Sequence, residues 1–124
     1  MDLLLSLVGK LYKPEGRTPE EGFDCYGLVR WVLKENGFVE LPVDRMKFLA
    51  ARHYAEIIDY PTEVNRFDVL FCAMEAPVVD HLGIAISPAD FIHGAHVFGA
   101  VVCEPICKYA YAGKIKAIGR VRCS

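Results

Sequence analysis

The fold is decided by the stretch Gly22-Phe23-Asp24-Cys25-Tyr26-Gly27-Leu28-Val29 and by the residues that follow it. From Cys25 onward, apolar residues recur at three- and four-residue steps, as expected for a helix that buries one face: Leu28, Val29, Val32 and Leu33. Asp24 is a favoured N-cap residue, and Asn36-Gly37 is a typical stop signal. The sequence therefore predicts a helix over residues 25–35.

Cys25 stands in the first turn of this predicted helix. The unpaired N–H groups and the positive end of the helix dipole lower the pKa of a thiol at that position, and the thiolate is the nucleophilic form. Most cysteines, however, are small buried apolar residues. Position alone therefore leaves a structural role for Cys25 the simpler interpretation.

The remaining elements predict an α+β protein. An amphipathic helix is expected over residues 3–11, a loop over 13–22, and a second helix from Met46 to Ile58. After Pro61 the chain turns to short apolar runs typical of strands; they cover residues 69–72, 81–86, 91–93, 99–103 and 115–121. Helices followed by strands predict N-terminal helices packed on an antiparallel sheet, with residues 1–124 as a single domain.

Composition excludes some classes of function. The chain is 53% apolar and 24% charged, with a net charge of -2, so no basic field is present and nucleic acid is not expected as a partner. The chain starts with an acid after Met1 and a short apolar run, which does not resemble a signal peptide, and no run reaches the roughly 18 apolar residues of a membrane span. We expect synthesis in the cytoplasm. Five unevenly spaced cysteines argue for reduced thiols.

Histidines supply the partners that a nucleophilic thiol needs. A thiol requires a base, and the base must itself be oriented. His53 falls in the predicted second helix, whereas His81 begins one apolar strand and His93 ends the next. Antiparallel neighbours bring such residues onto one face. Each histidine alone is more simply a half-buried structural residue, but the combination with Cys25 favours a catalytic site.

Three motifs resemble those of one known family. Asp24-Cys25-Tyr26-Gly27-Leu28-Val29 resembles an Asp-Cys-Ser-Gly-Leu-Val helix start, His81-Leu82-Gly83-Ile84 resembles a His-Val-Gly-Ile strand, and Phe91-Ile92-His93 resembles the strand with a third polar residue. In this order they are similar to the NlpC/P60 cysteine peptidases, which have a papain-like fold and cut cell-wall peptides. The resemblance implies hydrolysis of peptidoglycan stem peptides without a cofactor.

The same resemblance assigns roles to individual residues. It implies that Cys25 is the nucleophile, His81 the base and His93 the residue that orients His81. Tyr12, in Gly9-Lys10-Leu11-Tyr12, matches a tyrosine that helps to form the oxyanion hole. Asp24 matches an acid that binds a free amino group of the substrate, and a role in helix capping alone is the equal alternative.

The sequence departs from the family pattern at three places. Tyr26 replaces a small Ser, and we expect its bulk beside Cys25 to narrow the substrate site or to shift its preference. Phe67-Asp68 stands where the family usually has Gly-Asp. His96 is an additional histidine that competes with His93 as the residue orienting His81.

Three other interpretations stay open. A metal site is suggested by His93, His96, Cys103 and Cys107, but their spacing does not fit a standard zinc module and we expect no metal. A catalytically inactive structural or binding module of the same fold is a second alternative. A Cys-dependent amidase or acyltransferase is the third.

A more specific expectation concerns bacteriophages. A short chain without a signal peptide or wall-binding repeat resembles the small family members carried by bacteriophages, and the stretch from Tyr12 to Gly22 with its Gly16-Arg17 pair resembles that branch. The resemblance implies a tail-associated protein, made in the cytoplasm, that acts on the wall as part of a virion. Its expected partners are peptidoglycan stem peptides and phage tail proteins.

Overall fold

The computed structural model describes residues 3–50, 55–58, 64–75 and 77–123. Its helical elements are the 3-10 turns η1 (Leu5–Leu7) and η3 (His96–Phe98) and the α-helices α1 (Cys25–Glu35), α2 (Arg45–Ala50) and α3 (Ile106–Tyr111). Its strands are β1 (Arg17–Thr18), β2 (Gly22–Phe23), β3 (Ala55–Ile58), β4 (Val69–Cys72), β5 (His81–Ala85), β6 (Asp90–Ala95), β7 (Ala100–Pro105) and β8 (Ile115–Val121).

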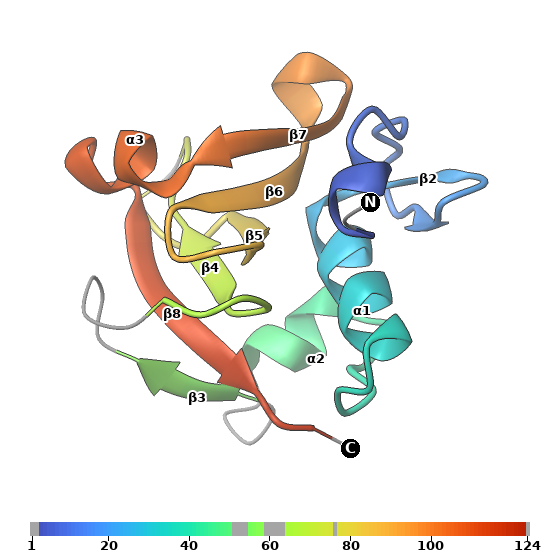
Figure 1. Ribbon diagram of the computed structural model, residues 1–124, viewed down its shortest axis with the longest axis horizontal. Coiled ribbons are helices and arrows are strands. Elements are labelled where there is room, and N and C mark those ends of the chain that lie inside the picture. The colour runs from blue at the N-terminus through green and yellow to red at the C-terminus, as the bar shows by residue number, and fades with distance from the viewer. Residues whose placement is uncertain (1–2, 51–54, 59–63, 76, 124) are drawn as a thin grey trace.

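The main sheet has six strands in the order β3-β8-β4-β5-β6-β7, and each strand pairs antiparallel with its neighbours. A small two-stranded sheet of β1 and β2 precedes α1. Figure 1 shows α1 and α2 on one side of the main sheet, with α3 at the far end of β7. The predicted α+β class with an antiparallel sheet is confirmed.

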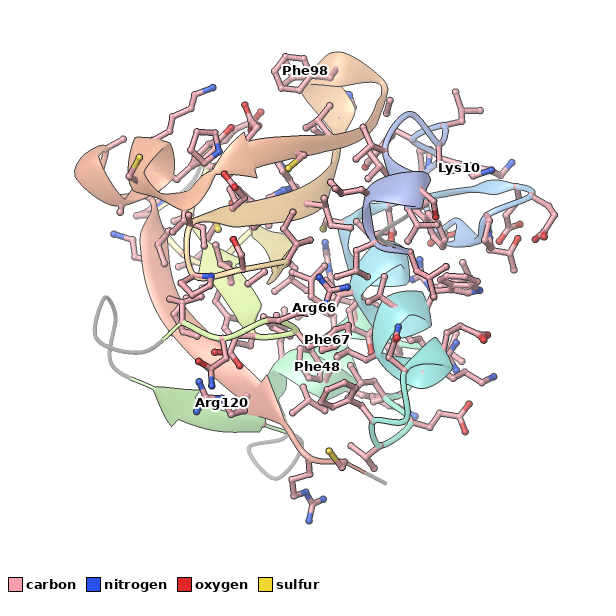
Figure 2. All side chains as sticks on the ribbon, in the orientation of Figure 1. Lys10, Phe48, Arg66, Phe67, Phe98 and Arg120 are labelled. Atoms are coloured by element: carbon pink, nitrogen blue, oxygen red, sulfur yellow. The ribbon has the colours of Figure 1, made fainter. Side chains whose placement is uncertain are left out.

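Helix α1 covers residues 25–35, as its apolar periodicity predicts. Asp24 caps it, because the Asp24 carboxylate accepts a hydrogen bond from the Gly27 N–H at 2.7 Å. The buried face of α1 joins residues of β4, β5 and β6 in one apolar cluster. Figure 2 shows Phe48 and Phe67 in the layer between α1 and the sheet.

The two faces of the sheet pack against different partners. On β4, Val69 belongs to the cluster around α1, whereas Leu70 and Cys72 belong to a second cluster that includes Ile106 of α3. Successive strand residues point to opposite faces, so the continuous apolar run of β4 fits a strand covered on both sides. This burial leaves Cys72 in the core.

Two predicted helices are shorter than expected. The predicted helix over residues 3–11 is wrong beyond the turn η1, because the backbone of Gly9 and Tyr12 instead donates hydrogen bonds to Val101 and Gly99 at the edge of β7. The predicted helix from Met46 to Ile58 is wrong at its end, since Ala55–Ile58 pairs with β8 as strand β3. His53 lies outside the described residues.

The strand predictions are close to the structure. Residues 69–72 and 115–121 match β4 and β8, and the other three predicted strands differ by one or two residues at their ends. Helix α3 was missed because it is a single short segment of six residues after Pro105, too short for a clear helical period.

Two backbone positions explain residues of the sequence motifs. A Cβ at Gly27 would lie 1.9 Å from the Gly16 carbonyl oxygen, so the loop before β1 packs directly on the first turn of α1. Phe67 has φ +74°, a conformation that glycine adopts without strain. This conformation accounts for the Gly that the family usually has at the position of Phe67. In this chain the Phe67 ring packs on the Phe38 ring, with 5.1 Å between the two centroids.

Candidate active site

A cleft of about 520 Å³ opens at the start of α1. Its lining includes all five residues predicted for the site: Tyr12, Asp24, Cys25, His81 and His93. Cys25 is 6% exposed at the first position of α1. The structure therefore brings the predicted nucleophile, base and orienting residue into one cleft.

Strand β6 approaches the start of α1 at Gly94. A Cβ at Gly94 would lie 3.1 Å from the backbone carbonyl of Asp24 and 3.4 Å from the Cys25 nitrogen. These distances leave little room for a side chain. Glycine at this position allows the strand that carries His93 to lie against the backbone that carries Cys25.

The side chains of His81 and His93 are hydrogen-bonded to each other. The register of β5 and β6 pairs Ile84 with Ile92, which places the two histidines diagonally on neighbouring strands. His81 Nε2 and His93 Nδ1 are 2.7 Å apart, and the rings meet edge to face. His96, by contrast, is exposed and its ring contacts Tyr12, so of these two histidines it is His93 that is hydrogen-bonded to His81.

His93 is held tightly in the sheet. Its side chain is 3% exposed, and its ring stacks on Phe91 with 4.7 Å between centroids. A Cβ at Gly83 would lie 2.5 Å from the Phe91 ring, so the glycine two residues after His81 makes room for the ring that supports His93. This packing fixes the plane of the His93 imidazole.

Glu104, on β7, is a site residue that sequence reasoning missed. Its Oε2 lies 2.7 Å from His93 Nε2, and its Oε1 accepts from Lys108 Nζ at 2.8 Å. The Tyr109 hydroxyl also donates to Oε2. A single acid at the end of the apolar run Ala100 to Cys103 was the available signal.

The pKa of Cys25 is raised, contrary to the lowering predicted from its place at a helix start. Burial is the main cause, and the nearby Asp24 carboxylate adds to it. The Leu82 backbone N–H and the Arg45 guanidinium act in the opposite direction without cancelling these effects. The cap that satisfies the helix N-terminus also places a negative charge beside the thiol. Cys25 therefore rests as a thiol.

The pKa of His81 is lowered from 6.5 to about 4, mainly by burial and then by the neighbouring His93. Asp80 and Glu104 raise it by smaller amounts. Because His81 is neutral at neutral pH, it is available to accept a proton. The resting state is thus a neutral thiol and a neutral imidazole that line the same cleft.

Tyr12 and Arg45 line the same cleft as Cys25. The pKa of Tyr12 is raised, chiefly by burial and then by Cys25 and Asp24, so its hydroxyl stays a hydrogen-bond donor. Arg45 opens α2 and is exposed. Sequence reasoning missed Arg45, because the segment between α1 and α2 brings it to the cleft and no local motif marks it.

Asp24 has several partners already. One oxygen accepts from Gly27 and from Arg17 at 2.8 Å, and the other accepts from the Glu15 N–H at 3.1 Å. Its side chain is 16% exposed and also lines a second hollow of about 890 Å³ that contains Arg17 and Arg45. Capping is therefore established by geometry, and Asp24 also lines the cleft.

Tyr26 does not narrow the substrate site, so that expectation is wrong. Its side chain is fully buried, stacks on Phe48 at 5.5 Å and donates a hydrogen bond to the Pro42 carbonyl. The second position of the helix points into the core rather than into the cleft. Tyr26 instead anchors the segment that leads to Arg45.

Within the described part of the chain, no group of three or more His, Cys, Asp or Glu residues is arranged to hold a metal. Cys103 and Cys107 are exposed, and both ring nitrogens of His93 are engaged by His81 and Glu104. Among the same described residues, no helix has the length and apolar character needed to cross a membrane.

A helix that begins at a cysteine and packs on an antiparallel sheet with paired histidines places the chain among α+β proteins with a candidate cysteine–histidine site. The family model named NlpC/P60 matches residues 9–120, and the chain belongs to the NlpC/P60 family. The murein DD-endopeptidase MepH of Escherichia coli (strain K12) is 29% identical over 93 residues, which are 74% of this chain and 34% of MepH. The chain thus spans about a third of that relative's length.

Solved structures show the same fold. The NlpC/P60 domain of the peptidoglycan hydrolase SagA superposes with a TM-score of 0.73 at 19% identity, over 95% of this chain and 92% of that domain. NlpC2 from Trichomonas vaginalis has a TM-score of 0.79 at 17% identity, over 98% of this chain and 44% of NlpC2. These likenesses support the architecture described above.

Because its pKa is raised, Cys25 is predicted to react slowly with alkylating agents in the folded protein. Iodoacetamide reacts with thiolate, so at pH 7 Cys25 should be alkylated more slowly in the folded protein than in urea, and its rate should climb with pH above the range of an ordinary thiol. Peptide mapping by mass spectrometry measures each site. Exposed Cys107 is the internal control. Faster alkylation of Cys25 in the folded protein at pH 7 would contradict the neutral pair.

Proposed function

We propose that this chain is a cysteine peptidase that hydrolyses peptide bonds in peptidoglycan stem peptides. The observation that carries the proposal is the 2.7 Å bond between His81 and His93 in the cleft where Cys25 begins α1. An inactive module has no need for a buried imidazole pair beside a helix-start thiol. Membership in the family and the murein endopeptidase relative support the substrate class.

The first half of the reaction uses His81 as a general base. His81 Nε2 is bonded to His93, so Nδ1 is the nitrogen that takes the Cys25 proton. The Cys25 sulfur then attacks the peptide carbonyl carbon, and the carbonyl oxygen becomes an oxyanion. Tyr12 and the Cys25 backbone N–H donate to it, and each such donor contributes roughly 3 to 4 kcal/mol to transition-state stabilisation.

The second half releases both products. Protonated His81 gives its proton to the departing amine as the C–N bond breaks, which leaves a thioester on Cys25. Water, deprotonated by His81, then attacks the thioester and the Cys25 sulfur leaves with a proton returned from His81. Arg45 and the Leu82 N–H, which favour the charged sulfur, support it as attacking and leaving group.

Asp24 is proposed to recognise a free amino group on the substrate in addition to capping α1. It lines both the cleft and the neighbouring hollow. An ammonium group in the hollow would share this carboxylate with Arg17, which is bonded to it at 2.8 Å. A stem peptide with a free N-terminus is therefore the expected substrate, in preference to one whose N-terminus is blocked.

The experiment incubates wild type, Cys25→Ala and Cys103→Ala with purified stem peptides that carry free or acetylated N-termini. Wild type and Cys103→Ala should release new fragments, faster from the free peptides, whereas Cys25→Ala should release none, because it lacks the nucleophile. Liquid chromatography with mass spectrometry identifies the fragments and the bond cut. Cys103 lies on β7 and is exposed, so its change is a matched cysteine control.

Two results would sink the peptidase proposal. Wild type that leaves every stem peptide intact would favour the inactive module. Cys25→Ala that cuts as fast as wild type would mean that another group performs the reaction. Transfer of the acyl group to an added amine, with little hydrolysis, would instead identify an acyltransferase.

We further propose that the protein is made in the cytoplasm and acts from a bacteriophage tail. The likeness of the stretch from Tyr12 to Gly22 to the phage branch of the family supports this. That stretch packs on the start of α1, where Arg17 bonds both Gly16 and Asp24. Mass spectrometry of virions purified from the host that carries this sequence should detect its peptides. Their absence from purified virions, with abundant protein in the host lysate, would refute the assignment.

A further inference from the structure

The hydrogen bond between His81 and His93 is followed by a second hydrogen bond, from His93 to a residue outside the predicted site. His81 is bonded to His93, and His93 is bonded through its other ring nitrogen to Glu104 on the next strand. The His93 side chain is 3% exposed and that of Glu104 is 11% exposed. This series of partly buried polar contacts runs from the cleft to α3, and its outer end has no role in the reaction steps given above.

Hydrogen bonds from neighbouring side chains keep the Glu104 carboxylate ionised. Burial alone would raise the pKa of Glu104, but hydrogen bonds from Lys108, Tyr109 and His93 outweigh it and lower the pKa to about 2. An ionised carboxylate carries no proton and can only accept hydrogen bonds. His93 Nε2 must therefore hold the proton in the bond to Glu104.

The position of the His93 proton in turn determines the position of the His81 proton. The pKa of His93 is lowered, mainly by burial, so its ring is neutral and has a single N–H. With that N–H at Nε2, Nδ1 is an acceptor, and His81 must donate to it from Nε2. Neutral His81 then has no proton on Nδ1. That is the protonation state a general base needs.

We propose that Glu104 is a positioning residue that sets the tautomers of His93 and His81, so that His81 Nδ1 is left ready to accept the Cys25 proton. The inference rests on the proposed cysteine-peptidase function. Without an acceptor at position 104, His93 can carry its proton on Nδ1 and donate it to His81. The proton of His81 then moves to Nδ1, and the base is blocked.

The tautomers are measured directly by NMR. Long-range proton–nitrogen spectra of 15N-labelled protein at neutral pH distinguish protonated from bare ring nitrogens. Wild type should show both His81 and His93 protonated at Nε2. Glu104→Leu, which keeps the size but removes the acceptor, should shift part or all of both protons to Nδ1. Glu104→Gln retains an oxygen acceptor and should keep the wild-type pattern.

The same variants are assayed on stem peptides. Glu104→Leu should lower kcat on the order of 10²-fold with little change in KM, less than the roughly 10⁴-fold that follows when the group directly orienting a catalytic histidine is altered. Glu104→Gln should restore most of that loss. Glu35→Leu is the matched control, because Glu35 is an exposed acid at the end of α1, and it should leave kcat unchanged.

The outcomes separate this inference from the proposed function. Wild type with His93 protonated at Nδ1 overturns it without any variant, so it stays testable even if Glu104→Leu fails to fold. A folded Glu104→Leu with wild-type tautomers and kcat overturns it as well. If the tautomers shift as expected but wild type cuts no stem peptide, the control of the tautomers by Glu104 stands and the peptidase function fails.

Discussion

The structure depends on the contact between the first turn of α1 and strand β6. Gly94 brings the strand so close to the Asp24 and Cys25 backbone that a Cβ would lie 3.1 Å from the Asp24 carbonyl, and Gly27 brings the preceding loop against the same turn from another side. Both contacts are made by backbone rather than by adaptable side chains. A thiol fixed in this way lines the same cleft as the imidazoles carried by β5 and β6, and a fixed arrangement of this kind favours proton transfer between them. The apolar face of α1 then holds the arrangement against the sheet.

The same contact determines the electrostatics of Cys25, the proposed nucleophile. Asp24 satisfies the helix start and binds Arg17, but its charge and the burial of the site raise the pKa of Cys25. A thiol in that state reacts only when a neighbouring base removes its proton during the attack. The lowered pKa of His81 keeps that base neutral. The burial that makes Cys25 a poor thiolate therefore also makes the histidine available, and the two effects have one cause.

Local patterns predicted the parts of the fold that local interactions determine. The helix at Cys25 follows from its period and its cap, and the strands at 69–72 and 115–121 follow from apolar runs between breakers. The order Cys25, His81, His93 likewise pointed to one cleft. Elements that depend on tertiary pairing were not predictable: Ala55–Ile58 is a strand because β8 lies beside it.

The outer residues of the site were missed for the same reason. Glu104 contacts His93 through the pairing of β6 and β7, and Arg45 reaches the cleft through a segment held by Tyr26. Neither has a sequence motif of its own. Tyr26 also shows how a residue beside a nucleophile in sequence can point away from it, since successive helix positions are about 100° apart.

The central claim is that Cys25 forms a covalent acyl intermediate with its peptide substrate. Rapid acid quenching of wild type with excess stem peptide, followed by intact-protein mass spectrometry, tests it directly. The account predicts a transient mass increase equal to the acyl half of the peptide, located on Cys25 and removed by hydroxylamine as expected for a thioester. Turnover of peptide at quench times when no adduct forms on Cys25, or an adduct on a different residue, would contradict it.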